Sequence, residues 1–154
     1  MPHIHDKVDF TVEVFIVYDN TVLLRKHDKY KIWLSVGGHI EPDEDPIQAA
    51  VREVKEEIGL DVVLFGDVHH SEKSENFKEL LPPRFMNRHR ISDTHEHITF
   101  VYFAKTNTNT IQQGEVEISD EVHWFTLSGL DDPKYALRDN IKYYAKRALA
   151  ELKD

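Results

Sequence analysis

The chain contains no cysteine among its 154 residues. That absence excludes a disulfide framework, a thiolate metal site and a cysteine nucleophile. Long hydrophobic runs are also lacking, since the longest aliphatic and aromatic run, "VFIVY" at residues 14–18, is far too short to cross a bilayer. The first ten residues, "MPHIHDKVDF", contain no apolar run of the signal-peptide type. We therefore expect no membrane partner and a cytoplasmic location.

Positive charge is scarce. Lysine and arginine number 19 against 28 aspartates and glutamates, which gives a formal net charge of -9. Because duplex binding requires a basic face, this balance argues against a nucleic-acid partner. Hydrophobic residues make up 40% and charged residues 31% of the chain, as in ordinary globular proteins. The length predicts a single domain over residues 1–154.

The apolar pattern predicts an α/β fold. Runs of β-branched, aromatic and aliphatic residues predict strands, at residues 8–18, 21–25, 31–36, 62–68, 97–105 and 121–127. Helical spacing predicts one helix at about 46–58 and a second from Pro133 toward the C-terminus. Residues 69–95 show no clear periodicity, so we expect a long connection with one helical turn in "NFKELL". Several strands interrupted by two helices predict a mixed sheet with a helix on each face.

The helix at 46–58 has clear start and stop signals. Asp45 is a good N-cap, Pro46 fits the first helical position, and Gln48 stands at capping-box spacing. Gly59 is the expected C-terminal stop. This segment is therefore the helix with the best defined ends in the sequence.

Two faces of this helix differ in character. The apolar face comprises Ile47, Ala50, Val51, Val54 and Ile58. Glu53, Glu56 and Glu57 fall on the opposite side, within an arc of about 100°, so we expect all three outside the core. A solvated face explains many such clusters, because like-charge pairs cost only about 0.2–0.5 kcal/mol each. Here the preceding Gly37-Gly38 favours a cation site, since glycine backbone can approach an ion closely.

Residues 38–60, "GHIEPDEDPIQAAVREVKEEIGL", resemble the Nudix box, G-x5-E-x7-R-E-U-x-E-E-x-G-U with U a bulky aliphatic. Every specified position is filled, by Gly38, Glu44, Arg52, Glu53, Val54, Glu56, Glu57, Gly59 and Leu60. Nine matches at fixed spacing make the resemblance specific. The surrounding strands are also similar to those of a Nudix domain, so the resemblance covers nearly the whole chain.

The resemblance implies a Nudix fold, an α/β/α sandwich around a mixed β-sheet. It further implies hydrolysis of a nucleotide or nucleoside-diphosphate derivative, dependent on Mg²⁺ or Mn²⁺. The family's metal ligands map onto Glu53, Glu56 and Glu57, joined by the carbonyl of Gly37. Arg52 would orient a glutamate, and Gly38 and Glu44 would support the loop. The expected partner is a small-molecule nucleotide substrate, and the oligomeric state stays open, a homodimer included.

A basic patch stands out at residues 84–97, "RFMNRHRISDTHEH". Arg84, Arg88 and Arg90 are candidates for binding substrate phosphate, because the guanidinium fork clamps phosphate well. The histidines of this segment, His89, His95 and His97, form either a second metal site or an ordinary polar strand edge. A general base outside the box is also open, with candidates Glu96, Glu115, Glu117 and Glu121. Candidates for stacking on a base are Trp33, Phe85, Tyr102 and Trp124, although such aromatics are commonly core.

Three alternatives to a hydrolase are open. A catalytically silent Nudix domain that senses nucleotides is the first, and the complete box argues against it. The second is a Nudix-fold isopentenyl-diphosphate isomerase, which relies on a catalytic cysteine that this sequence lacks. A structural domain with an acidic helix is the third, and metal titration would separate it from the others.

Overall fold

The computed structural model describes residues 4–69, 74–114 and 121–154. In these ranges the strands are β1 Val8–Tyr18, β2 Thr21–Lys26, β3 Trp33–Leu34, β4 Val36–His39, β5 Val63–Leu64, β6 Phe85–Ser92, β7 His95–Lys105 and β8 Glu121–Phe125. The helices are α1 Pro46–Ile58 and α2 Asp139–Glu151, with short 3-10 turns η1 Gly129–Asp131 and η2 Pro133–Tyr135. None of the described helices is long and apolar enough to cross a membrane.

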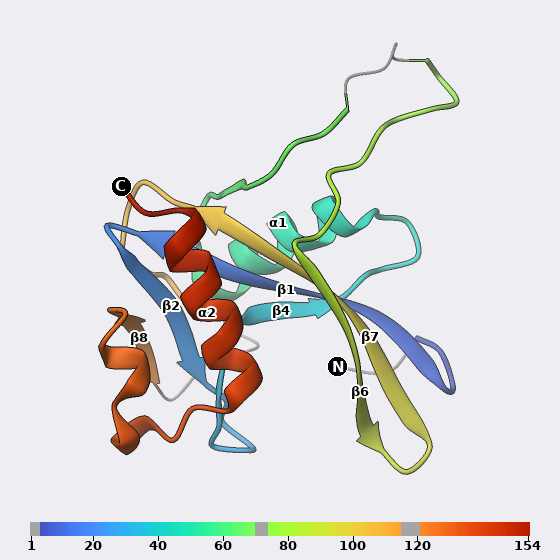
Figure 1. The fold of residues 1–154 in the computed structure, drawn as a ribbon. Helices are drawn as coiled ribbons and strands as arrows, with labels where there is room; N and C mark the ends of the chain where they lie inside the picture. The colour runs from blue at the N-terminus through green and yellow to red at the C-terminus, as the bar shows by residue number, and fades with distance from the viewer. Residues whose placement is uncertain (1–3, 70–73, 115–120) are drawn as a thin grey trace.

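One mixed sheet lies between the two helices, with α2 in front of it and α1 behind it in Figure 1. Its main strand order is β3-β2-β1-β7-β5, while β4 pairs with β1, β6 with β7 and β8 with β2. Strands β1 and β7 run parallel and the other pairs are antiparallel. The predicted α/β class with a mixed sheet and a helix on each face is therefore confirmed.

Strand β1 contributes to both sides of the core. Its side chains alternate between the faces, so Phe15 and Val17 pack in the cluster that contains the buried residues of α2. Val14 and Ile16 point the other way, into the cluster that contains the buried residues of α1. A strand buried on both faces reads as a continuous apolar run, which explains "VFIVY".

Helix α1 begins and ends where the sequence predicts. The Asp45 carboxylate accepts the backbone N–H of Gln48 at 2.8 Å, and the Gln48 side chain accepts the backbone N–H of Asp45 at 2.9 Å. Gly59 follows the helix with a φ of 72°, a left-handed conformation that favours glycine. The capping box and the glycine stop are thus both confirmed.

The predicted faces of α1 are partly wrong. Val51, expected in the apolar stripe, is 42% exposed, whereas Glu53 and Glu57, expected outside the core, are only 2% and 3% exposed. The reason is tertiary, because β4 and β2 lie against the flank of the helix that carries these two carboxylates. Glu56 is the one of the three whose side chain is mostly exposed, at 62%.

Other differences concern short or polar elements. The strand predicted at 31–36 is two strands, β3 and β4, and the strand predicted at 62–68 shortens to β5. The predicted helical turn in residues 76–81 does not form, and the segment expected as a connection instead contains β6. Among the described residues, strand β6 pairs with β7 alone and is largely exposed, so it needs no apolar periodicity. Helix α2 starts at Asp139 rather than near Pro133, because Ala136 adopts a left-handed φ of 48° after η2.

Candidate active site

The glycine pair in β4 lets three segments approach one another closely. A Cβ added to Gly38 would lie 2.3 Å from Oε1 of Glu53, so this carboxylate rests directly against the glycine backbone. A Cβ added to Gly37 would lie 2.1 Å from the carbonyl oxygen of Val12 in β1. Both positions therefore require glycine. Gly38 leaves space for the Glu53 carboxylate, and Gly37 allows β4 to pair closely with β1.

Arg52 lies at the centre of a hydrogen-bond network. Its Nη1 donates to Oε1 of Glu53 at 3.0 Å and to Oε2 of Glu56 at 3.1 Å. Its Nε donates to Oε2 of Glu44 at 2.9 Å, and its Nη2 donates to the carbonyl oxygen of His39 at 3.0 Å. The hydrogen bond from Arg52 holds the pKa of Glu44 below its usual range. One guanidinium thus connects the helix, the loop before it and β4.

Glu44 and Glu57 are held by different contacts. The Glu44 carboxylate also accepts the backbone N–H of Glu41 at 2.9 Å, so it closes the loop before α1. Oε2 of Glu57 lies 2.9 Å from Nη2 of Arg25, a residue of β2 whose side chain is only 12% exposed. Guanidinium groups, from Arg52 or from Arg25, therefore contact each of the three helix glutamates, Glu53, Glu56 and Glu57.

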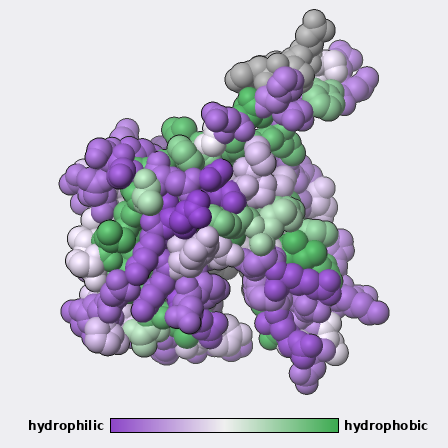
Figure 2. Space-filling model, viewed as in Figure 1, coloured by the Kyte–Doolittle hydropathy of each residue, from purple (hydrophilic) through white to green (hydrophobic). Residues whose placement is uncertain are grey.

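A cavity of about 410 Å³ opens beside this network. It lies between the start of α2 and the β6–β7 hairpin, where Figure 2 shows a hollow with hydrophilic residues on both sides. Gly37 and Gly38 form part of its wall. The charged and imidazole side chains among its lining residues are Glu13, Arg25, His27, His39, His89, Arg90, His97 and Arg138. A cavity of this size is large enough for a small-molecule ligand.

Glu13 is a carboxylate in this wall that the sequence did not single out. It stands opposite Gly37 in the β1–β4 pair, and its Oε1 accepts a hydrogen bond from the Ser35 hydroxyl at 2.7 Å. Burial raises the pKa of Glu13 to about 6, and the Ser35 hydrogen bond opposes that rise. A signal was present in the sequence, because one glutamate interrupts the apolar run of β1.

This raised pKa predicts a pH-dependent stability in metal-free buffer. The folded protein favours neutral Glu13, so its contribution is fully present below the ordinary pKa of 4.5 and is lost as the pH rises through about 6. Glu13→Gln keeps an acceptor for Ser35 and should stabilise the protein by about 2 kcal/mol at pH 8, with little effect at pH 4. Denaturant unfolding of both proteins with chelator measures this difference. An equal change in unfolding free energy at pH 4 and pH 8 would show that the titration of Glu13 does not cause the pH dependence.

The three arginines of the predicted basic patch do not share one place. Arg90 lines the cavity. Arg88 is exposed and pairs with Glu96, at 2.8 Å from Nε to Oε2. Arg84 forms an ion pair with Glu151 of α2 and lies over the ring of Phe65. Of the three candidates for phosphate binding, the structure therefore brings Arg90 alone to the cavity.

The remaining candidates lie apart from the cavity or outside the described residues. Glu96 is held by Arg88, which lowers its pKa, and Glu121 is exposed with Lys26 Nζ at 3.9 Å. Glu115 and Glu117 lie outside the described residues. The four aromatics considered for stacking all belong to the core or pack against it: Trp33, Phe85, Tyr102 and Trp124.

Comparisons with known proteins identify the family of this chain. A family model described as the NUDIX domain matches residues 9–147. A CTP pyrophosphohydrolase of Escherichia coli (strain K12) is 32% identical over 97 residues, which are 59% of this chain and 72% of that protein. A dihydroneopterin triphosphate diphosphatase of the same strain is 48% identical over 42 residues, 27% of this chain and 28% of that protein.

Solved structures extend the likeness to nearly the full length. A NUDIX family hydrolase from Clostridium perfringens is 34% identical, with a TM-score of 0.82 over 94% of this chain and 98% of that one. A Caenorhabditis elegans Ap4A hydrolase, 19% identical, shares the fold, with a TM-score of 0.64 over 93% of this chain and 96% of that one. Since the family model spans most of the sequence and a NUDIX hydrolase matches almost all of it, the chain belongs to the NUDIX family and is a Nudix-type hydrolase.

Proposed function

We propose that this enzyme cleaves the diphosphate linkage of a nucleotide or nucleoside-diphosphate derivative, with Mg²⁺ or Mn²⁺ as cofactor. The observation that carries the proposal is the position of the Glu53 carboxylate, which rests against Gly38 at the edge of a cavity whose wall contains three arginines. Of a nucleoside triphosphate and a nucleotide sugar, we favour the triphosphate. The two Escherichia coli relatives are named for CTP and for dihydroneopterin triphosphate, which supports that choice.

The donor set fits a hard divalent cation. Glu53, Glu56 and Glu57 would hold the ion, together with the Gly37 carbonyl, and all of these donors are oxygen atoms, as Mg²⁺ prefers. Each carboxylate already contacts a guanidinium, so the site accommodates positive charge at these oxygens. When bound, the ion would neutralise charge on the phosphate oxygens and acidify the attacking water.

The other residues of the site would bind and orient the substrate. Arg25, Arg90 and Arg138 bring positive charge to the cavity wall, where the phosphates would lie. The water oxygen forms a bond to phosphorus, the bridging P–O bond breaks, and a carboxylate at the site takes the proton. Arg52 would act by positioning, because it holds Glu53 and Glu56 in place rather than lining the cavity.

Activity is expected to require a divalent cation. Chelator should abolish turnover of a panel of nucleoside triphosphates and diphosphate conjugates, and added Mg²⁺ should restore it, because the three glutamates alone supply no positive charge. Release of phosphate and pyrophosphate measures the reaction and identifies the linkage cleaved. Full turnover in chelator would contradict the mechanism, and tight nucleotide binding without turnover in Mg²⁺ would instead support a sensing domain.

Arg90→Ala is expected to raise KM about tenfold or more, because a guanidinium on the cavity wall can pair with substrate phosphate. Arg88→Ala is the matched control from the same strand, and its exposed pairing with Glu96 predicts little change. Steady-state kinetics with the preferred substrate measures both. Equal KM values for the Arg90 variant and the unmodified enzyme would remove Arg90 from the binding site.

A further inference from the structure

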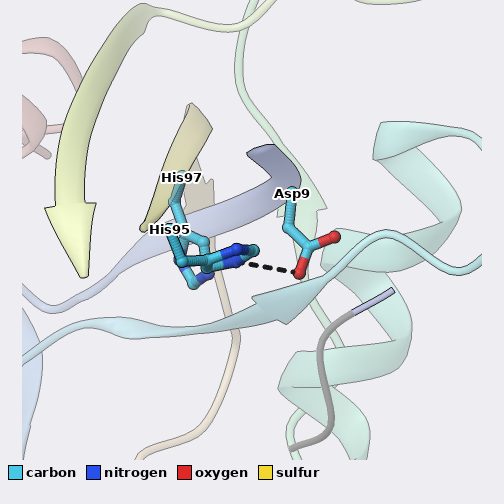
Figure 3. A group of neighbouring side chains, drawn as sticks. All are labelled: Asp9, His95 and His97. Carbon is cyan, nitrogen blue, oxygen red and sulfur yellow. Dashed lines mark ion pairs between the residues drawn. The ribbon is translucent and has the colours of Figure 1, made fainter. Parts of the chain in front are cut away.

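A second group of side chains lies where the start of β1 meets the start of β7, and it includes none of the box glutamates. Asp9 is fully buried, and its carboxylate accepts the backbone N–H groups of Ile4 at 3.2 Å and His5 at 2.7 Å. Asp9 stands opposite His97 in the parallel β1–β7 pair. His95 is two residues from His97, so both imidazoles lie on the same face of β7, next to Asp9 in Figure 3.

Two distances from Asp9 are close to those of metal coordination. One ligand atom from each of Asp9, His95 and His97 lies within 4.8 Å of the others. Oδ2 of Asp9 is 3.2 Å from Nε2 of His95 and 3.2 Å from Nε2 of His39 in β4. Metal–ligand bonds of about 2.0–2.1 Å in a tetrahedral site place neighbouring ligand atoms about 3.3–3.4 Å apart. The distances from Oδ2 of Asp9 to Nε2 of His95 and to Nε2 of His39 are therefore already close to those between ligand atoms of a tetrahedral site.

The donor chemistry selects the kind of ion. Imidazole nitrogens with one carboxylate oxygen suit Zn²⁺ and related transition metals, whereas Mg²⁺ prefers oxygen ligands alone. The rings of His39 and His95 stand nearly perpendicular to that of His97, with centroids 5.1 and 5.3 Å away. His39 and His89, whose ring centroid is 5.6 Å from that of His97, both lie outside the group of three ligand atoms. Of these two, His39 is the one whose Nε2 lies 3.2 Å from Oδ2 of Asp9.

We propose that Asp9, His95 and His97 bind one Zn²⁺ ion, with His39 as the fourth ligand. The ion would hold the start of β1, the start of β7 and the end of β4 together. It would lie at the wall of the cavity, because His39 and His97 line it, and beside the Arg52 network, because the His39 carbonyl accepts a hydrogen bond from Arg52. The sequence offered His89, His95 and His97 as a candidate metal site. In the proposed site the buried Asp9 takes the place of His89.

Metal titration of the full chain tests the site. The protein is stripped with chelator, placed in excess Mg²⁺ to occupy the glutamates, and titrated with Co²⁺, whose visible absorption is strong only in four-coordinate sites. We expect one equivalent to bind, Zn²⁺ to displace it, and the melting temperature to rise with either ion. Glu57→Gln should retain this binding, which separates the site from the box glutamates.

Histidine variants give the decisive comparison. His95→Asn and His97→Asn should each weaken binding by about 100-fold or more, because each removes a direct ligand. His89→Asn, the matched control, should bind as the unmodified protein does. His97 is only partly buried, so His97→Asn should fold. If His95→Asn does not fold, the metal affinity of His97→Asn alone decides whether these histidines bind the ion. Unchanged binding in His97→Asn, or no stoichiometric binding by the unmodified protein, would show a hydrogen-bonded Asp–His cluster instead and overturn the proposal.

Discussion

Gly38→Ala is expected to lower kcat by about 100-fold or more while the protein stays folded. The added Cβ would lie 2.3 Å from Oε1 and 2.5 Å from Cδ of Glu53, so the carboxylate must leave its place. A side-chain end can move at low cost in stability, but a displaced carboxylate no longer supports charge neutralisation at the reacting phosphate. Steady-state kinetics in saturating Mg²⁺ and thermal melting in chelator measure the two effects.

Gly37→Ala is the matched comparison for the effect on stability. Its Cβ would lie 2.1 Å from the carbonyl oxygen of Val12, which belongs to the backbone of β1 and cannot rotate away. The clash should cost about 1–3 kcal/mol of folding stability, as overpacking does elsewhere. The two adjacent glycines thus predict different stabilities: Gly38→Ala should melt close to the unmodified protein, whereas Gly37→Ala should melt clearly lower. A Gly38 variant with normal kcat would show that Glu53 works equally well from another position.

Glu57→Gln is expected to reduce kcat by about 100- to 1000-fold and to weaken Mg²⁺ binding, because it removes one charged ligand with almost no change in size. Its burial beside Arg25 adds a second effect. Metal-free stability should fall by about 1–2 kcal/mol, since the glutamine still accepts a hydrogen bond from Arg25 but the charge is lost. Isothermal titration with Mg²⁺, steady-state kinetics and denaturant unfolding measure the three quantities.

Glu56→Gln separates the two effects. Its side chain is 62% exposed, so metal-free stability should change by less than about 0.5 kcal/mol. Metal affinity and kcat should still fall steeply if Glu56 is a ligand. Near-normal turnover in either variant, combined with a much lower melting temperature, would make that glutamate structural rather than a metal ligand.

Local signals were sufficient for part of the fold. Helix α1 could be predicted from end to end, because Asp45, Gln48 and Gly59 act through hydrogen bonds and backbone conformation within a few residues. Strand β1 was equally clear, since burial on both faces requires a long apolar run. The family was also evident in the sequence, and the NUDIX match over residues 9–147 confirms it. A single domain and a cytoplasmic location stay predictions, and the oligomeric state stays open.

Contacts distant in sequence set the limits of prediction. The periodicity of α1 cannot show that β4 covers Glu53, because that contact depends on the tertiary packing of the helix against β4. Arg25 and Glu13 carry no motif, and only the sheet brings them to the cavity. Strand β6 escaped detection because an exposed edge strand carries no apolar alternation. Asp9 lies 86 residues from His95, so the parallel pairing of β1 and β7 was needed to join them.

The position of Arg52 has a consequence for how this sequence can vary. Its guanidinium holds Glu44, Glu53, Glu56 and the His39 carbonyl at once. Substitutions within one such network do not add, because the first loss already frees groups that the second would have freed. The effect of a change at 44 or 53 therefore depends on which residue occupies 52. Because of this epistasis, the loop, α1 and β4 are expected to tolerate several substitutions made together better than the same substitutions made one at a time.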